Sequence, residues 1–139
     1  MGTILCATRG GEESNRTEEA AIEKAASGGD MLIFFYVVDV EFLAYAKYTL
    51  RSDVVHGELQ GMAEFLLAMA VERAHKKHVK ATALIRHGNF IEELVKAASE
   101  VGTTLVAMGR PDDEEAANAL AAKIEELSLR TGIPFVILP

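Results

Sequence analysis

The sequence predicts a three-layer, doubly wound α/β fold, in which helices cover both faces of a parallel β-sheet. Short runs of large or β-branched apolar residues alternate with longer segments whose apolar residues recur three and four positions apart. Several short runs are continuously apolar, which is typical of parallel strands buried on both faces. In such a sheet the ligand crevice lies at the carboxyl ends of the strands, where the strand order reverses.

Five short segments are predicted to be strands because they are apolar and bounded by turn residues. In chain order they are Thr3–Thr8, Met31–Val38, Val79–Ile85, Thr104–Met108 and Phe135–Leu138.

Four longer segments show helical periodicity. The first covers Ser14–Ser27 and is ended by Gly28-Gly29. The second runs from about Gly57 to Lys77, with a stripe formed by Leu59, Met62, Ala63, Leu66, Ala70 and Ala74. The third follows Asn89 as N-cap and ends at Gly102, and the last stops before Thr131-Gly132. Phe42–Tyr48 is either a short helix or an ordered loop.

Length and composition indicate one domain over residues 1–139. Half of the residues are apolar, which is enough for a full hydrophobic core. The formal charge of -7, from 21 acidic and 14 basic residues, argues against nucleic acid or an anionic membrane as the main partner. Protein and small-molecule partners remain open.

Cys6 is the single cysteine, so one chain forms no internal disulfide and no cysteine-based zinc site. Its place in the first strand favours core packing over a reactive thiol, which requires exposure and a lowered pKa. No segment reaches the roughly 18 apolar residues of a spanning helix, and the start of the chain lacks the pattern of a signal peptide. We therefore expect a soluble, cytoplasmic protein.

The chain resembles the universal stress protein family in four pieces that occur in the family's order: ILCATRGGEESNRTEEA, FFYVVDV, HGNFIEELVKAASEVGTTLVAMG and IPFVILP. The resemblance covers essentially the whole chain, although each piece is weak alone. It implies an adenine nucleotide alpha hydrolase-like fold with strand order 3-2-1-4-5. It also implies a homodimer formed partly through the last strand.

Many members of that family bind ATP through a pattern of Gly, two residues, Gly, nine residues and Gly followed by Ser or Thr, with an Asp after the first strand. Here Gly109 matches the first glycine, but Asp112 stands at the second and Ala122-Lys123 at the final pair. Arg9 stands at the position of the Asp. We expect no tight ATP binding and no cofactor.

The acidic run Asp112-Asp113-Glu114-Glu115 has a structural interpretation. Asp112 or Asp113 is expected to cap the last helix, and the two glutamates favour the positive end of its dipole. This interpretation is compatible with a lost nucleotide site, because the carboxylates would occupy the helix end that otherwise binds phosphates.

Three arginines fall near the carboxyl ends of strands: Arg9, Arg86 and Arg110. In the order 3-2-1-4-5, Arg9 and Arg110 could share the crevice and bind a small carboxylate or phosphate. The alternative is ion pairing with Asp39, Asp112 or Asp113.

Histidines give weaker signals. His75 and His78 have a spacing that could chelate a metal with a third ligand, but a solvated helix end explains them more simply. His87 is more simply a turn residue than a catalytic one. No nucleophile motif and no acid–base pair of carboxylates stands out, so the sequence gives no positive case for an enzyme.

The segment Phe135, Val136, Ile137 and Leu138 is the candidate dimer interface, because an apolar strand at the edge of a sheet is normally paired or covered. Pro134 and Pro139 limit how far the pairing extends.

Two functions follow from these patterns. The first is a non-enzymatic regulatory or interaction module with an unidentified protein partner, whose crevice residues to follow are Arg9, Asp39, Arg110 and Asp112. The alternative is a small-ligand sensor that binds ATP, AMP or another anion through Arg9, Val38, Gly109 and Arg110. Nucleotide hydrolysis is a distant third. The sequence leaves open whether the segment 39–57 closes over the crevice.

Overall fold

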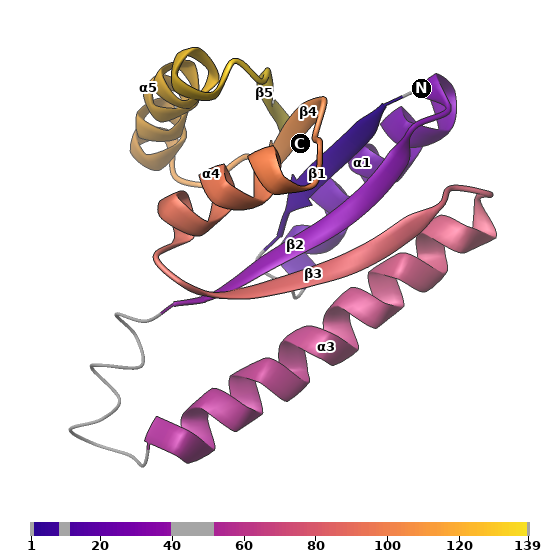
Figure 1. Cartoon of the computed structure of the whole chain (residues 1–139), viewed down its shortest axis with the longest axis vertical. Helices are drawn as coiled ribbons and strands as arrows, with labels where there is room; N and C mark the ends of the chain where they lie inside the picture. The colour runs from indigo at the N-terminus through magenta and orange to yellow at the C-terminus, as the bar shows by residue number, and fades with distance from the viewer. Residues whose placement is uncertain (1, 9–11, 40–51, 139) are drawn as a thin grey trace.

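A computed structural model describes residues 2–8, 12–39 and 52–138, and the side chains of residues 12, 13, 39 and 52–56 lie outside this description. The described part contains five strands and four helices (Figure 1). Their bounds are β1 Thr3–Ala7, α1 Glu12–Gly28, β2 Met31–Asp39, α3 Ser52–Lys76, β3 Ala81–Gly88, α4 Phe90–Glu100, β4 Leu105–Gly109, α5 Glu114–Thr131 and β5 Phe135–Leu138.

The strands form one parallel sheet in the order β3-β2-β1-β4-β5, which confirms the predicted fold and strand order. β1 is central, and Cys6 pairs in register with Phe34 of β2 and Ala107 of β4. β3 and β5 form the two edges of the sheet.

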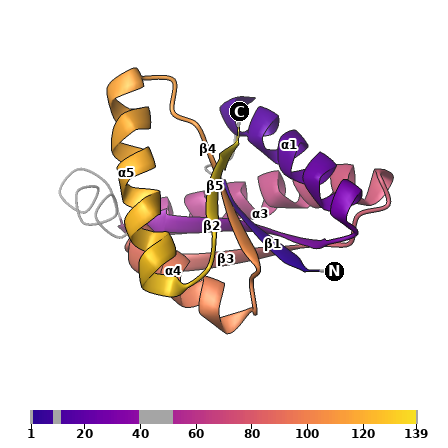
Figure 2. The same cartoon turned by 90° about the horizontal axis from the view of Figure 1, so that it is seen from above.

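Helices cover both faces of the sheet. α1 and α3 pack on one face, and α4 and α5 lie on the other (Figures 1 and 2). Because strand side chains alternate, each of the inner strands supplies apolar groups to both layers. Ile4, Cys6 and Phe34 belong to the first layer, whereas Leu5 and Phe35 belong to the second.

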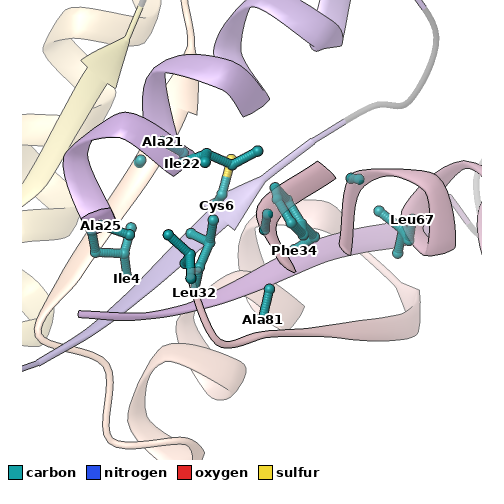
Figure 3. Close-up of a cluster of buried hydrophobic side chains, with 13 residues drawn as sticks. Ile4, Cys6, Ala21, Ile22, Ala25, Leu32, Phe34, Leu67 and Ala81 are labelled. Atoms are coloured by element: carbon teal, nitrogen blue, oxygen red, sulfur yellow. The ribbon is translucent and has the colours of Figure 1, made fainter. Parts of the chain in front are cut away.

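Cys6 is a core residue, as the sequence indicates. It is fully buried between β1 and α1, beside Ile22 (Figure 3). Burial, together with a smaller effect of the nearby Glu18 carboxylate, raises the pKa of its thiol to about 12.

The largest differences from the predicted bounds are in α3 and β3. α3 begins at Ser52 rather than near Gly57, because Gly57 lies within the helix and does not interrupt it. β3 covers Ala81–Gly88 rather than Val79–Ile85. β3 begins two residues later than predicted because α3 ends in a tight turn, in which the Val79 N–H donates to the Ala74 carbonyl at 3.0 Å. Its carboxyl end is extended by pairing with β2 as far as Gly88.

The predicted stripe on α3 is partly wrong. Ala63, Ala70 and Ala74 are buried as expected, but the large side chain that joins them in the core is Leu67, and Met62 faces outward. The segment Phe42–Tyr48 lies outside the described residues.

Candidate functional site

The candidate site lies at the carboxyl ends of β1 and β4, which are adjacent at the point where the strand order reverses. The register brings Ala7 of β1 opposite Met108 of β4, so that Thr8 and Gly109 follow at the same end of the sheet. This is the crevice to which the sequence assigns ligand binding.

Buried polar side chains gather on the β1 side of this crevice. Thr8, Ser14, Thr17 and Glu18 are each at most 9% exposed. Buried polar groups are retained only where they are hydrogen-bonded. The Thr8 hydroxyl donates to Glu18 Oε2 at 2.8 Å, which joins the end of β1 to α1.

Glu18 is the centre of an ionic network between α1 and α3. Its Oε1 accepts from Arg73 Nη2 at 2.6 Å. Arg73 Nε is 3.1 Å from Glu19 Oε1, and Lys77 Nζ is 3.7 Å from Glu19 Oε2. A buried carboxylate requires such a cation, because an unpaired charge in the interior is costly. Glu18 therefore has a structural role, because it links α1 to α3 through Arg73.

Gly109 is constrained by its contact with α1. A Cβ atom at this position would lie 2.6 Å from the hydroxyl oxygen of Thr17. This close approach of the Thr17 side chain favours a glycine at position 109 irrespective of any phosphate.

The turn after β4 uses its own hydrogen-bonding groups. The Arg110 N–H donates to the Leu138 carbonyl at 3.0 Å, and Pro111 has no N–H. Asp113 is the N-cap of α5, accepting from the Ala116 N–H at 2.9 Å. Of the two predicted cap residues, Asp113 is therefore the one that caps α5.

α5 also occupies the part of the chain that corresponds to the nine-residue spacer of the nucleotide pattern. That spacer is 113–121, and α5 covers Glu114–Thr131. Ala122 and Lys123 therefore lie inside a helix, where backbone N–H groups bond to carbonyls four residues earlier.

The predicted ligand-binding residues are distributed as follows. Val38 is buried at the end of β2, and Arg110 is exposed without an ion-pair partner among the described residues. Arg9 lies outside the described residues, and for Asp39 only the backbone position at the end of β2 is described.

Arg86 lies away from the crevice. Its guanidinium forms an ion pair with the carboxylate of Glu100 at the end of α4. The predicted alternative of an ion pair with Asp39, Asp112 or Asp113 concerned the crevice arginines, and Arg110 forms no such pair among the described residues.

The histidines form no metal site among the described residues, which contain no group of three or more metal-binding side chains. His75 and His78 are exposed at the end of α3. The His87 ring nitrogen lies 2.8 Å from Gln60 Oε1. Within the same ranges, no helix is long and apolar enough to cross a membrane.

Comparison with known families adds evidence independent of this geometry. The family model described as "Universal stress protein family" matches residues 1–124. The chain belongs to the universal stress protein family. Comparison with curated protein sequences gives no match.

Solved structures agree with this universal stress protein fold. A protein of the family from Burkholderia pseudomallei superposes with a TM-score of 0.75 at 21% identity, covering 99% of this chain and 96% of that one. A universal stress protein in complex with cAMP has a TM-score of 0.72 at 20% identity, with coverages of 99% and 97%. One from Archaeoglobus fulgidus in complex with dAMP has a TM-score of 0.65 at 14% identity, with coverages of 100% and 98%.

The sequence did not predict the buried polar side chains on the β1 side of the crevice. Thr17 and Glu18 lie in a predicted helix that reads as polar on one face, and no local pattern marks them as buried. One signal was present: Glu18 falls in the first half of α1, which lies near the end of β1 when the connection after a strand is short.

Proposed function

We propose that this universal stress protein is a non-enzymatic regulatory or interaction module of the stress response, acting in the cytoplasm, whose nucleotide-binding motif is degenerate. Its strand order is that of the family's fold, but the carboxyl ends of β1 and β4 offer little to a polyphosphate.

The observation that carries the proposal is the turn between β4 and α5, where several of the backbone groups that could bind a phosphate are missing or already bonded. A phosphate cradle needs convergent N–H groups at a helix N-terminus. Here the N–H of Arg110 is bonded to Leu138, Pro111 has none, and Asp113 occupies the N–H of Ala116. The following residues continue directly into α5. The side chains therefore serve the helix in place of a ligand.

The negative charge at this turn also disfavours polyphosphate binding. Asp112, Asp113, Glu114 and Glu115 are all exposed at this turn. Two like unit charges about 4 Å apart repel by roughly 1 kcal/mol in water and by about 4 kcal/mol at an effective dielectric near 20. Each charge-assisted hydrogen bond forgone costs about 1.5–3 kcal/mol. Micromolar binding amounts to only about 8 kcal/mol, so these deficits are sufficient to remove it.

A second candidate function is a sensor for a smaller anion such as AMP. Two structural relatives are described in complex with cAMP and dAMP, each with a single phosphate. The exposed guanidinium of Arg110, which has no ion-pair partner in the described part of the chain, and the buried Val38 favour this alternative. A monophosphate needs fewer N–H donors than a triphosphate does.

The decisive experiment is to analyse untreated purified protein for bound nucleotide and then to measure its thermal unfolding with ATP, AMP and inorganic phosphate. A ligand present at about 100 times its Kd stabilises the fold by about 2.7 kcal/mol. We expect no co-purified nucleotide, no shift at millimolar ATP and no turnover of labelled ATP.

Arg110→Ala and Arg130→Ala form a matched pair for this measurement, because both remove an exposed arginine and only Arg110 adjoins the crevice. A shift with AMP that Arg110→Ala abolishes and Arg130→Ala preserves would favour the sensor. Co-purified ATP, or a shift with ATP, would overturn the proposal.

We further propose that the protein is a homodimer through β5. Its side chains Phe135, Val136, Ile137 and Leu138 are only partly buried in the single chain, and β5 is an edge of the sheet. Open edge strands invite pairing with another chain, and a two-fold axis would pair β5 antiparallel with its copy.

A further inference from the structure

The outer face of α3 carries an exposed apolar stripe, which we define as Met62, Phe65 and Met69. These side chains are 51%, 65% and 44% exposed. They are spaced by three and four residues, so they form one line along the helix. Most of the large apolar side chains that are exposed belong to this stripe. Among the described residues, the others are Met31 and Leu129.

The stripe is distinct from the face by which α3 packs on the sheet. Ala63, Leu67, Ala70 and Ala74 are buried against β2 and β3, and Figure 3 shows Leu67 in the same buried layer as Phe34. A helix that covers one face of a sheet normally presents polar residues on its other side. α3 is apolar on both sides, and such a clustered patch marks an interaction site more often than isolated exposed residues do.

We propose that the stripe is an interface between two copies of this chain, in which two α3 helices pack antiparallel about a two-fold axis. The interface differs from the proposed strand pairing, because α3 packs on β2 and β3, at the opposite edge of the sheet from β5 (Figure 1). Its existence does not depend on whether the crevice binds a nucleotide.

One antiparallel register brings apolar residues of the two copies face to face. When the two-fold axis crosses the helix at the level of position 67, Phe65 of each copy faces Met69 of the other. Methionine sulfur and aromatic rings make favourable contacts, and flexible methionine side chains adapt to the facing surface. A two-fold interface repeats each contact twice, so two such pairs form its centre.

Charge selects the same register. Glu58 lies one turn before the stripe and has no ion-pair partner among the described residues, whereas Lys76 lies at the other end. With the axis at position 67, Glu58 of each copy faces Lys76 of the other. Within one chain these two residues are about 27 Å apart along the helix. Among the residues that the structure describes, Lys76 pairs only with Glu72, at 3.7 Å, and both side chains are at least 70% exposed. It can reach a second carboxylate, and a parallel arrangement would place like charges together.

The experiment exploits this self-complementarity. Glu58→Lys and Lys76→Glu are measured by analytical ultracentrifugation over a concentration series, separately and mixed. Each variant alone should associate about tenfold more weakly, because two attractive pairs become repulsive at every interface.

An equimolar mixture of the two variants should regain wild-type association. Between unlike chains, the introduced lysine faces the introduced glutamate, and the unchanged Glu58 and Lys76 face each other. The double variant Glu58→Lys/Lys76→Glu should regain association in a single species, because both pairs are then exchanged and attractive again.

Two controls keep the result specific. Glu64→Lys makes the same charge change on α3, but on a different side from the stripe, and should leave association unchanged. Phe65→Ser should abolish association through α3, leaving a monomer, or a dimer through β5 if that strand also pairs. Its thermal unfolding should stay close to that of the wild type, because the side chain is mainly in solvent.

Three results would overturn the proposal. One is wild-type protein that remains a monomer at hundreds of micromolar. The proposal fails in that case even if the monomer binds neutral phosphatidylcholine vesicles or a different protein. Another is an unchanged assembly in Glu58→Lys, Lys76→Glu and Phe65→Ser. The third is weakened association in both single charge variants without recovery in their mixture.

Discussion

Cys6 places a thiol at the centre of the sheet, in contact with no solvent. In the folded chain its pKa is about 12 instead of the ordinary 9.0, because burial disfavours the thiolate and the Glu18 carboxylate opposes it as well. The unfolded chain therefore loses this proton first as the pH rises.

We predict that Cys6 is unreactive toward thiol reagents at pH 8 in the native protein and reacts at once in denaturant. The same shift contributes stability that is complete below pH 9 and is lost as the pH rises toward about 12. Urea unfolding at pH 8 and pH 10 measures this loss. Cys6→Ala serves as control, and it should lose less stability between the two pH values than the wild type does. Equal losses would contradict the assignment.

Gly109 gives a second prediction at the scale of single residues. Gly109→Ala should lower the free energy of unfolding by about 1–3 kcal/mol, since the new methyl group would overlap the Thr17 hydroxyl. In the background of Thr17→Ala the same change should cost much less, because the overlapping oxygen is gone. A double-mutant cycle in urea measures the coupling. Additive effects would show that Gly109 is required for another reason.

Helices and strands differ in how well the sequence predicts them. The strands were predictable because short continuous apolar runs rich in β-branched and aromatic residues, such as Leu32–Phe35, are typical of strands buried on both faces of a sheet. Asn89 and Asp113 were recognisable as caps, because a side chain directly before an apolar period can accept from the first free N–H groups.

α3 shows where periodicity fails. Its apolar residues surround the helix, so the spacing alone does not tell which face meets the sheet, and the sequence assigned Met62 to the core. The choice between Met62 and Leu67 is made by the position of β2 and β3, which is a tertiary property. The same ambiguity hid the exposed stripe.

The ionic link between α1 and α3 gives a prediction at the scale of elements. Glu18→Ala should lower the free energy of unfolding by about 3 kcal/mol, because it removes the buried carboxylate that accepts from the Thr8 hydroxyl and leaves the partly buried Arg73 paired with Glu19 alone. Glu19→Ala removes a neighbouring carboxylate that is 41% exposed and should cost less than about 1 kcal/mol. Similar costs for both, measured by urea unfolding, would refute a special role for Glu18.

At the scale of the whole molecule, the sequence predicts the location of the site better than its contents. The crevice between β1 and β4 follows from the strand order alone. The self-capped turn could be anticipated from the acidic run, whereas the contact between Thr17 and Gly109 could not, because it depends on how closely α1 docks. Arg9 and the side chain of Asp39 remain predictions.

The proposed strand dimer can be tested without disturbing the sheet. The carbonyls of Pro134 and Leu138 accept hydrogen bonds from Val106 and Arg110, so the backbone groups of Phe135 and Ile137 point to the open edge. Ile137→Pro removes one outward N–H and should abolish the pairing of β5 while preserving the fold. Light scattering and circular dichroism report the two properties.

Val136→Pro is the matched control, because alternation places its N–H toward β4. It should destabilise the single chain itself. An Ile137→Pro variant that is fully folded and has the wild-type assembly would exclude pairing through β5.

The hydrogen bond from Arg110 to Leu138 joins two regions that are otherwise described separately. Arg110 stands at the mouth of the crevice, and Leu138 is the last residue of the edge strand. Any shift of β5 on meeting another copy would strain or release the Arg110 amide. Thermodynamic linkage then requires reciprocity. A ligand that binds in the crevice and changes this bond alters the affinity of self-association by some factor, and self-association alters the affinity for that ligand by the same factor.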